Sequence, residues 1–178
     1  MNWYTVDATG ASRHLWLHVT GEGAPTYGRW ISPSGHDVKK VLGERGPVGL
    51  DVSVHWIQAP EHYGKQRTDI LWQTGLLGLK LMSDRMRRIL EDNGAQLETF
   101  EDVEIRLRDG DRLTGYAGVL EETQAAGPVH SLWRGRRSHR LVVSEEVRNA
   151  IKQARLTGIE TEPVDGPFPA DRPGFFDD

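Results

Sequence analysis

The chain has 178 residues, of which 37% are hydrophobic and 27% charged, and its net charge is −4. This composition favours one globular domain, and the mild charge gives no reason to expect a nucleic-acid or anionic-membrane surface. The absence of cysteine excludes disulfides, thiolate catalysis and cysteine metal sites.

No apolar run approaches the roughly 20 residues that a membrane-spanning helix needs. The first residues also lack the basic start and apolar core of a secretory signal. We therefore expect a cytoplasmic protein with no membrane partner and no nucleic-acid partner.

Strands dominate the predicted elements of the first third of the chain. The segment His14–Val19 alternates in type along its length, which is typical of a strand. Residues 32–47 are rich in glycine and proline, so we expect mostly loop, with a short helical turn at Asp37–Leu42. Val48–Gln58 is β-rich and predicts a second strand, and Asp69–Trp72 predicts another short one.

Two similar segments follow, Leu81–Leu90 and Val142–Ile151. Each has two apolar residues, a serine, an acidic residue and then apolar positions at helical spacing. Ser83 and Ser144 stand where a helix N-cap is needed, because a serine oxygen can accept a hydrogen bond from a first-turn N–H. Each unit therefore predicts strand, helix, strand, and the closing strands are expected at Gln96–Phe100 and Ile159–Val164.

The region between the two units predicts a hairpin and one further strand. Val103–Leu107 and Leu113–Glu121 flank Asp109–Asp111, whose Asp-Gly-Asp sequence is typical of a hairpin turn. Ser131–Trp133 is a strand candidate. Residues 165–178 form a proline-rich tail that cannot sustain a helix or a central strand.

These elements predict an α+β fold with a mainly antiparallel sheet. The two N-capped helices come from the duplicated strand-helix-strand unit and are expected on one face of the sheet. We expect a single domain over residues 1–178. It divides into a β-rich part (1–67), the duplicated part (68–164) and the tail (165–178).

The second unit carries a resemblance to a known family. Leu141–Val147, followed by Ala154–Val164, resembles the C-terminal signature of bacterial immunity proteins from polymorphic-toxin systems. The group is the myxobacterial-type immunity domain often called immunity family eleven, with its relatives. Asp69–Trp72 and Leu81–Ser83 match the first copy of the unit, so the resemblance covers roughly residues 68–164.

The first copy departs from the pattern of the second. Asn93-Gly94 stands in place of the threonine-glycine pair, and Phe100 replaces the proline-valine ending. The resemblance implies a small cytoplasmic protein that binds the C-terminal domain of a cognate toxin and blocks it. It implies no catalytic residues, no cofactor and no metal, and hence a protein that is not an enzyme. We expect a monomer or a weak homodimer.

Two charged clusters are candidates for toxin contacts. Carboxylates of an inhibitor can steer a basic partner and fill its active-site cleft, and arginines can bind an acidic partner. The alternative for both clusters is a solvated surface. The candidate residues are Glu98, Glu101, Asp102 and Glu104 in the acidic run, and Arg134, Arg136 and Arg137 in the basic one.

The rival hypothesis is an enzyme or small-ligand protein with a pocket near His55 and His62. Zinc needs three or four ligands, and the sequence supplies no motif for them. There is also no G-x-S-x-G nucleophile elbow, and Ser83 and Ser144 are better explained as helix caps.

The chain has six tryptophans, which is many for its length. Most of those on predicted strands should be core residues, because each ring buries a large apolar area. One or two left exposed would mark a partner surface. The tryptophans on predicted strands are Trp16, Trp56, Trp72 and Trp133.

Overall fold

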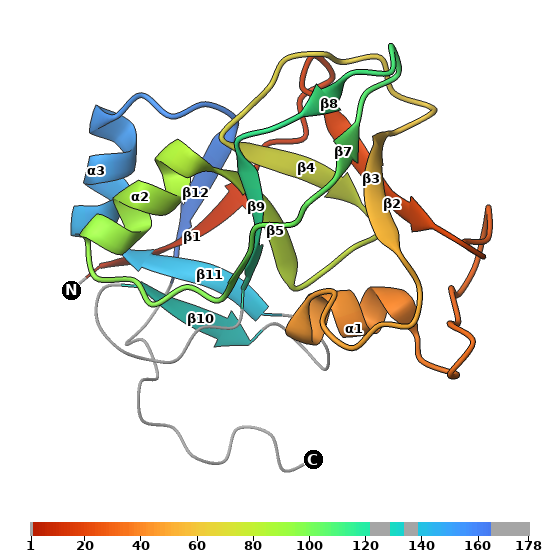
Figure 1. Cartoon of the computed structure of the whole chain (residues 1–178). Helices are drawn as coiled ribbons and strands as arrows, with labels where there is room; N and C mark the ends of the chain where they lie inside the picture. Colours follow the sequence, from red (N-terminus) through yellow and green to blue (C-terminus); the bar gives the residue numbers. More distant parts are fainter. Residues whose placement is uncertain (1, 122–128, 134–138, 165–178) are drawn as a thin grey trace.

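The computed structural model describes residues 2–121, 129–133 and 139–164 (Figure 1). Three helices and twelve strands occur in this part of the chain. In order they are β1 (Trp3–Ala8), β2 (Trp16–Gly21), α1 (Val38–Arg45), β3 (Val54–Gln58), β4 (Ile70–Thr74), β5 (Leu79–Ser83), α2 (Asp84–Asp92), β6 (Thr99–Phe100), β7 (Ile105–Arg106), β8 (Arg112–Leu113), β9 (Tyr116–Leu120), β10 (Val129–Trp133), β11 (His139–Ser144), α3 (Glu145–Gln153) and β12 (Ile159–Pro163).

The strands form two sheets. One has four strands in the order β10-β11-β1-β12, and the other has eight in the order β6-β9-β5-β4-β2-β3-β7-β8. All pairs between these strands are antiparallel except β2 with β4 and β3 with β7. The mixed α+β class and the antiparallel character are confirmed.

The division into two sheets differs from the single sheet expected, and the cause is a strand that the sequence analysis missed. β1 lies between β11 and β12 and pairs antiparallel with both. Its inward residues Val6 and Ala8 are buried. An N-terminal strand thus joins the C-terminal strands into a separate sheet.

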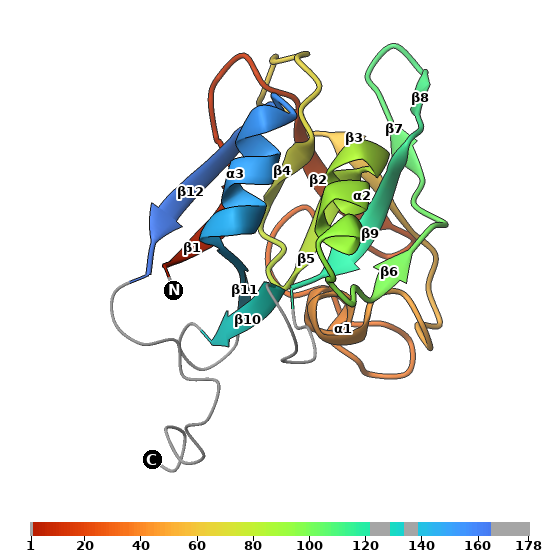
Figure 2. The ribbon, with the colours of Figure 1, turned by 90° about the vertical axis from the view of Figure 1, so that its left-hand side faces the viewer.

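Helices α2 and α3 lie side by side (Figure 2). Each begins directly after the second strand of an antiparallel hairpin, β4–β5 for α2 and β10–β11 for α3. Helix α2 therefore follows a strand of the eight-stranded sheet, and α3 follows a strand of the four-stranded sheet. The two helices do not share one face of a common sheet. The predicted serine caps are confirmed: Ser83 Oγ accepts from the Met86 N–H at 3.1 Å, and Ser144 Oγ accepts from the Val147 N–H at 3.4 Å.

The two helices bury their apolar faces in a core shared with both sheets. Met86 and Leu90 from α2 and Val147 and Ile151 from α3 belong to one cluster of buried side chains. Burial of each such side chain stabilises the fold by about 2 kcal/mol. This shared core holds the two hairpin-helix units together.

A second core lies within the curled eight-stranded sheet and is closed by α1. It includes Trp30 and Trp56, which are 1% and 2% exposed. Trp16 and Trp72 are partly buried, and Trp72 packs against the core that the two sheets share, so Trp56 is a full core residue and these two are core residues only in part. The side chain of Trp133 lies outside the described residues.

Several predicted elements are confirmed with different bounds. α1 is longer than the turn expected at Asp37–Leu42, and Asp37 caps it by accepting from the Lys40 N–H at 3.3 Å. β3 begins only at Val54, because the chain before it turns at Gly49, which has φ +78°. The hairpin across Asp109–Asp111 is present, with short strands β7 and β8. β6 covers only the end of the strand expected at Gln96–Phe100.

A largely buried ion cluster links β1 to the eight-stranded sheet. Lys80 on β5 forms an ion pair with Asp7 on β1, and its Nζ lies 3.5 Å from Glu121 Oε1. Glu121 is 5% exposed, and its Oε2 accepts from the Gly78 N–H at 3.2 Å. Burial raises the pKa of Glu121, and the Lys80 charge offsets part of this rise.

The raised pKa of Glu121 predicts a pH-dependent stability. Because the folded pKa lies above the ordinary value of 4.5, the stabilising contribution of protonated Glu121 is complete below pH 4.5. That contribution is lost as the pH rises through the folded pKa. In urea unfolding, the free energy of unfolding of the wild type minus that of Glu121→Gln should therefore fall as the pH rises above 4.5. A difference that grows with pH would contradict this.

Candidate functional site

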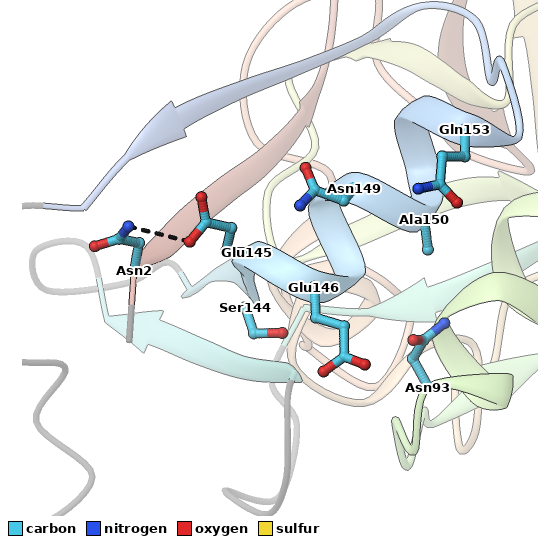
Figure 3. Close-up of a pocket in the computed structure, with 8 residues that line it drawn as sticks. All are labelled: Asn2, Asn93, Ser144, Glu145, Glu146, Asn149, Ala150 and Gln153. Carbon is cyan, nitrogen blue, oxygen red and sulfur yellow. Dashed lines mark hydrogen bonds between the residues drawn. The ribbon is translucent and has the colours of Figure 1, made fainter.

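A pocket of about 660 Å³ lies against α3 and reaches the C-terminal end of α2 (Figure 3). Its lining is built mainly from the first turns of α3, where Ser144 caps the helix and two glutamates follow. Asn93 contributes from the C-cap of α2. The lining residues are Asn2, Asn93, Ser144, Glu145, Glu146, Asn149, Ala150 and Gln153.

The lining of this α3 pocket is acidic and rich in side-chain amides. Glu145 and Glu146 are exposed, and no lysine or arginine is among the lining residues. Glu145 points toward Asn2, whose Nδ2 donates to Glu145 Oε2 at 3.1 Å, whereas Glu146 points to the other side of the first turn (Figure 3). Carboxylate and amide oxygens here can accept hydrogen bonds from cationic side chains of a partner.

Sequence reasoning missed this pocket. In the sequence, the helix dipole is enough to explain Glu145 and Glu146, since negative charge in a first turn stabilises a helix. That explanation stands, but it does not account for the amides that surround them. The only signal in the sequence was the recurrence of Asn149 and Gln153 one helical turn apart on α3.

Two carboxylates of the predicted acidic run are already paired with arginines of this chain. Glu101 Oε1 lies 2.6 Å from Arg87 Nη1. Glu104 Oε1 lies 2.9 Å from Arg106 Nε and 3.0 Å from Arg112 Nη2. The hydrogen bond from Arg106 is the main reason that the pKa of Glu104 is lowered.

The other two carboxylates of the run, Glu98 and Asp102, are exposed. A partner would therefore meet a surface whose charge is partly neutralised by Arg87, Arg106 and Arg112. The predicted basic candidates Arg134, Arg136 and Arg137 lie outside the described residues.

The two histidines of the rival hypothesis lie at different places along the sheet. His62 stacks on Trp16, with ring centroids 3.8 Å apart and planes 8° apart. His55 on β3 pairs with Thr20 on β2. Thr20 lies four residues beyond Trp16, which corresponds to about 13 Å of strand. The pocket beside the loop that carries His62 is lined by neither histidine. Among the described residues, no group of three or more His, Asp or Glu side chains is arranged to hold a metal ion.

A buried carboxylate, Asp69, connects the two hairpin-helix units. Its Oδ1 accepts from Ser83 Oγ at 2.6 Å, and its Oδ2 accepts from the Thr157 N–H at 2.8 Å and from Thr157 Oγ1 at 3.3 Å. The backbone of Asp69 bonds to the same two residues. The start of α2 is thereby tied to the turn between α3 and β12.

The threonine-glycine pair of the second unit is explained by this connection. Thr157 donates to Asp69, and Gly158 has φ +67°, a conformation that favours glycine. A Cβ on Gly158 would lie 2.3 Å from Thr68. Tyr116 Oη donates to the Thr68 carbonyl at 2.8 Å, and burial is the main reason that the pKa of Tyr116 is raised to about 12.

No model of a protein family matches this chain, and a search of the curated proteins found no match. The class that the fold defines is therefore a mixed α+β protein whose sheets are mainly antiparallel. No helix in the described ranges is long and apolar enough to cross a bilayer.

Proposed function

We propose that this chain is an immunity protein that binds the C-terminal domain of a cognate bacterial toxin and blocks it by occlusion. The observation that carries the proposal is the α3 pocket. Its two exposed carboxylates have no ion pair with a lysine or arginine in the described part of the chain. An acidic surface of this kind fits a basic cleft on a partner.

The resemblance to immunity proteins over residues 68–164 supports the same proposal. The finer claim about the fold is that β4–β5–α2 and β10–β11–α3 are two copies of one unit. Three similarities favour it: the antiparallel hairpin, the serine at its end, and an N-capped helix of nine residues in each copy. Asp69 and Thr157 join the two copies, so the threonine-glycine pair of the resembling motif has a structural role and other surface residues select the partner.

The mechanism is steric and electrostatic, with no reaction catalysed by this chain and no cofactor. A tight complex buries on the order of 1,600 Å² in total, so the α3 pocket supplies only the centre of the interface. Glu98 and Asp102, which are exposed, are the members of the acidic run best able to add to it. We propose a cytoplasmic protein that acts as a 1:1 partner of the toxin domain.

A double variant, Glu145→Gln with Glu146→Gln, tests the role of the pocket. We expect at least about tenfold weaker binding to the toxin domain encoded beside this gene, because two charge-assisted contacts are lost. Affinity would be measured by isothermal titration after co-expression and pull-down establish the pair.

The matched control is Glu22→Gln with Glu44→Gln, which removes the same charge at exposed positions away from α3. It should leave the affinity within about twofold of the wild type. Thermal unfolding of each variant would separate a binding loss from a weakened α3. Equal losses of affinity in the two double variants would contradict the assignment of the α3 pocket to the toxin interface. The absence of any complex would contradict the proposed function itself.

A further inference from the structure

A second pocket, of about 380 Å³, lies between the loop before β4 and the β7–β8 turn. Its volume falls within the roughly 300–1,000 Å³ typical of small-molecule sites. None of its lining residues belongs to the α3 pocket. They are Leu15, Gln58, Tyr63, Lys65, Arg67, Leu107, Arg108 and Asp109.

Positive charge dominates this second pocket. Lys65, Arg67 and Arg108 contribute three cations against the single carboxylate of Asp109. Within the described ranges, none of the three cations forms an ion pair. Asp109 is engaged in its own turn, where its Oδ1 accepts from the Asp111 N–H at 3.1 Å.

Arg108 is held in place without being neutralised. Its Nη2 donates to the carbonyls of Ala59, Pro60 and His62 at 3.0, 2.9 and 3.2 Å. Its guanidinium also lies over the Tyr63 ring, 4.6 Å from the centroid. Since a guanidinium has five N–H donors, this arrangement leaves Nε and Nη1 for another acceptor. A fixed cation whose contacts are all uncharged is suited to binding an anion.

The remaining lining is apolar or aromatic except for Gln58. Leu15 is 2% exposed and Leu107 is partly buried, while Tyr63 is 77% exposed. Gln58 is buried, and its Nε2 donates to the Gly64 carbonyl at 3.1 Å. The lining therefore provides an apolar surface and an exposed ring next to the cations.

We propose that this pocket binds a small organic anion, with a carboxylate or phosphate head on the cations and an apolar or aromatic body against Leu107 and Tyr63. This assignment goes beyond the proposed function and does not depend on it. The cations attract the charged head group, and the Nε and Nη1 donors of Arg108 can hydrogen-bond to it. Burial of the apolar body against the pocket lining adds to the binding free energy.

Titration of the full chain with phenyl phosphate, benzoate and phenol, followed by backbone amide NMR, tests the proposal. We expect saturable shifts for at least one anion, centred on the pocket residues, and none of comparable size for phenol. Whichever anion binds more tightly identifies the preferred head group. Arg67→Gln and Lys65→Gln should each weaken that binding about tenfold, because each removes a charged contact.

The matched control is Arg88→Gln, which removes an exposed arginine of α2 that does not line the pocket. It should bind the anion as the wild type does. The proposal would be overturned if neither anion gave saturable shifts, if phenol bound equally well, or if Arg67→Gln and Arg88→Gln behaved alike.

Discussion

Replacing Asp69 with alanine is expected to lower the free energy of unfolding by about 3 kcal/mol. Asp69 is 6% exposed and accepts hydrogen bonds from Ser83 Oγ and from both donors of Thr157. The variant leaves these donors without their acceptor in a largely buried place. It also removes the side-chain part of the link between the start of α2 and the turn before β12, while the backbone bonds of residue 69 to Ser83 and Thr157 remain. Urea unfolding followed by circular dichroism would measure the loss.

Two control variants separate this effect from simpler ones. Ser83→Ala removes the helix cap and one bond to Asp69, so it should cost about 1–2 kcal/mol. Asp102→Asn removes an exposed carboxylate and should change stability by less than about 0.5 kcal/mol. If Asp69→Ala were no more destabilising than Asp102→Asn, the connection between the two units would not contribute as described.

Replacing Gly158 with alanine is the second large effect, with an expected cost of about 3 kcal/mol. Its φ of +67° is unfavourable for alanine, and the added Cβ would lie 2.3 Å from Thr68 Cβ and Cγ2. Thr68 is buried and cannot swing away freely, since its Oγ1 donates to the Ile70 carbonyl at 2.7 Å. Chemical denaturation would measure the change.

Gly23→Ala is the matched control for this prediction. Gly23 has a similar φ of +71°, but an added Cβ would meet no atom within 4 Å. The control should therefore show only the backbone cost of about 1 kcal/mol. Equal costs at the two positions would mean that crowding against Thr68 contributes nothing.

Local sequence signals predicted the local structure well. Ser83 and Ser144 precede acidic residues and an apolar stripe, so the caps and the starts of α2 and α3 depend on neighbours in the chain. The turn at Asp109–Asp111 is local in the same sense. Such features can be predicted because the interactions that form them span only a few residues.

The sheet architecture depends on pairings that no local pattern specifies. β1 pairs with β11 and β12, which lie at the opposite end of the sequence. The parallel pairing of β2 with β4 likewise joins strands separated by a helix and a strand. Periodicity indicates that a segment is a strand, but it does not choose its neighbour.

The candidate sites show the same limit. The α3 pocket combines Asn2, Asn93 and the first turns of α3, which only the fold brings together. The cations of the second pocket were likewise not singled out, because Lys65 and Arg108 lie on different loops. In the acidic run, the pairing of Glu101 with Arg87 depends on the fold, which brings the residue after β6 close to α2. Charge in the sequence therefore identified candidates, but not which carboxylates remain available to a partner.

The most direct test of the proposed function is a stoichiometric titration of toxin activity. The proposed function places the gene of the toxin beside that of this chain, and the C-terminal domain of that toxin would be assayed with increasing amounts of the purified chain. Binding by occlusion predicts that activity falls linearly and reaches zero at one molecule of this chain per toxin domain. Inhibition by far less than one equivalent, or full activity at a large excess, would contradict it.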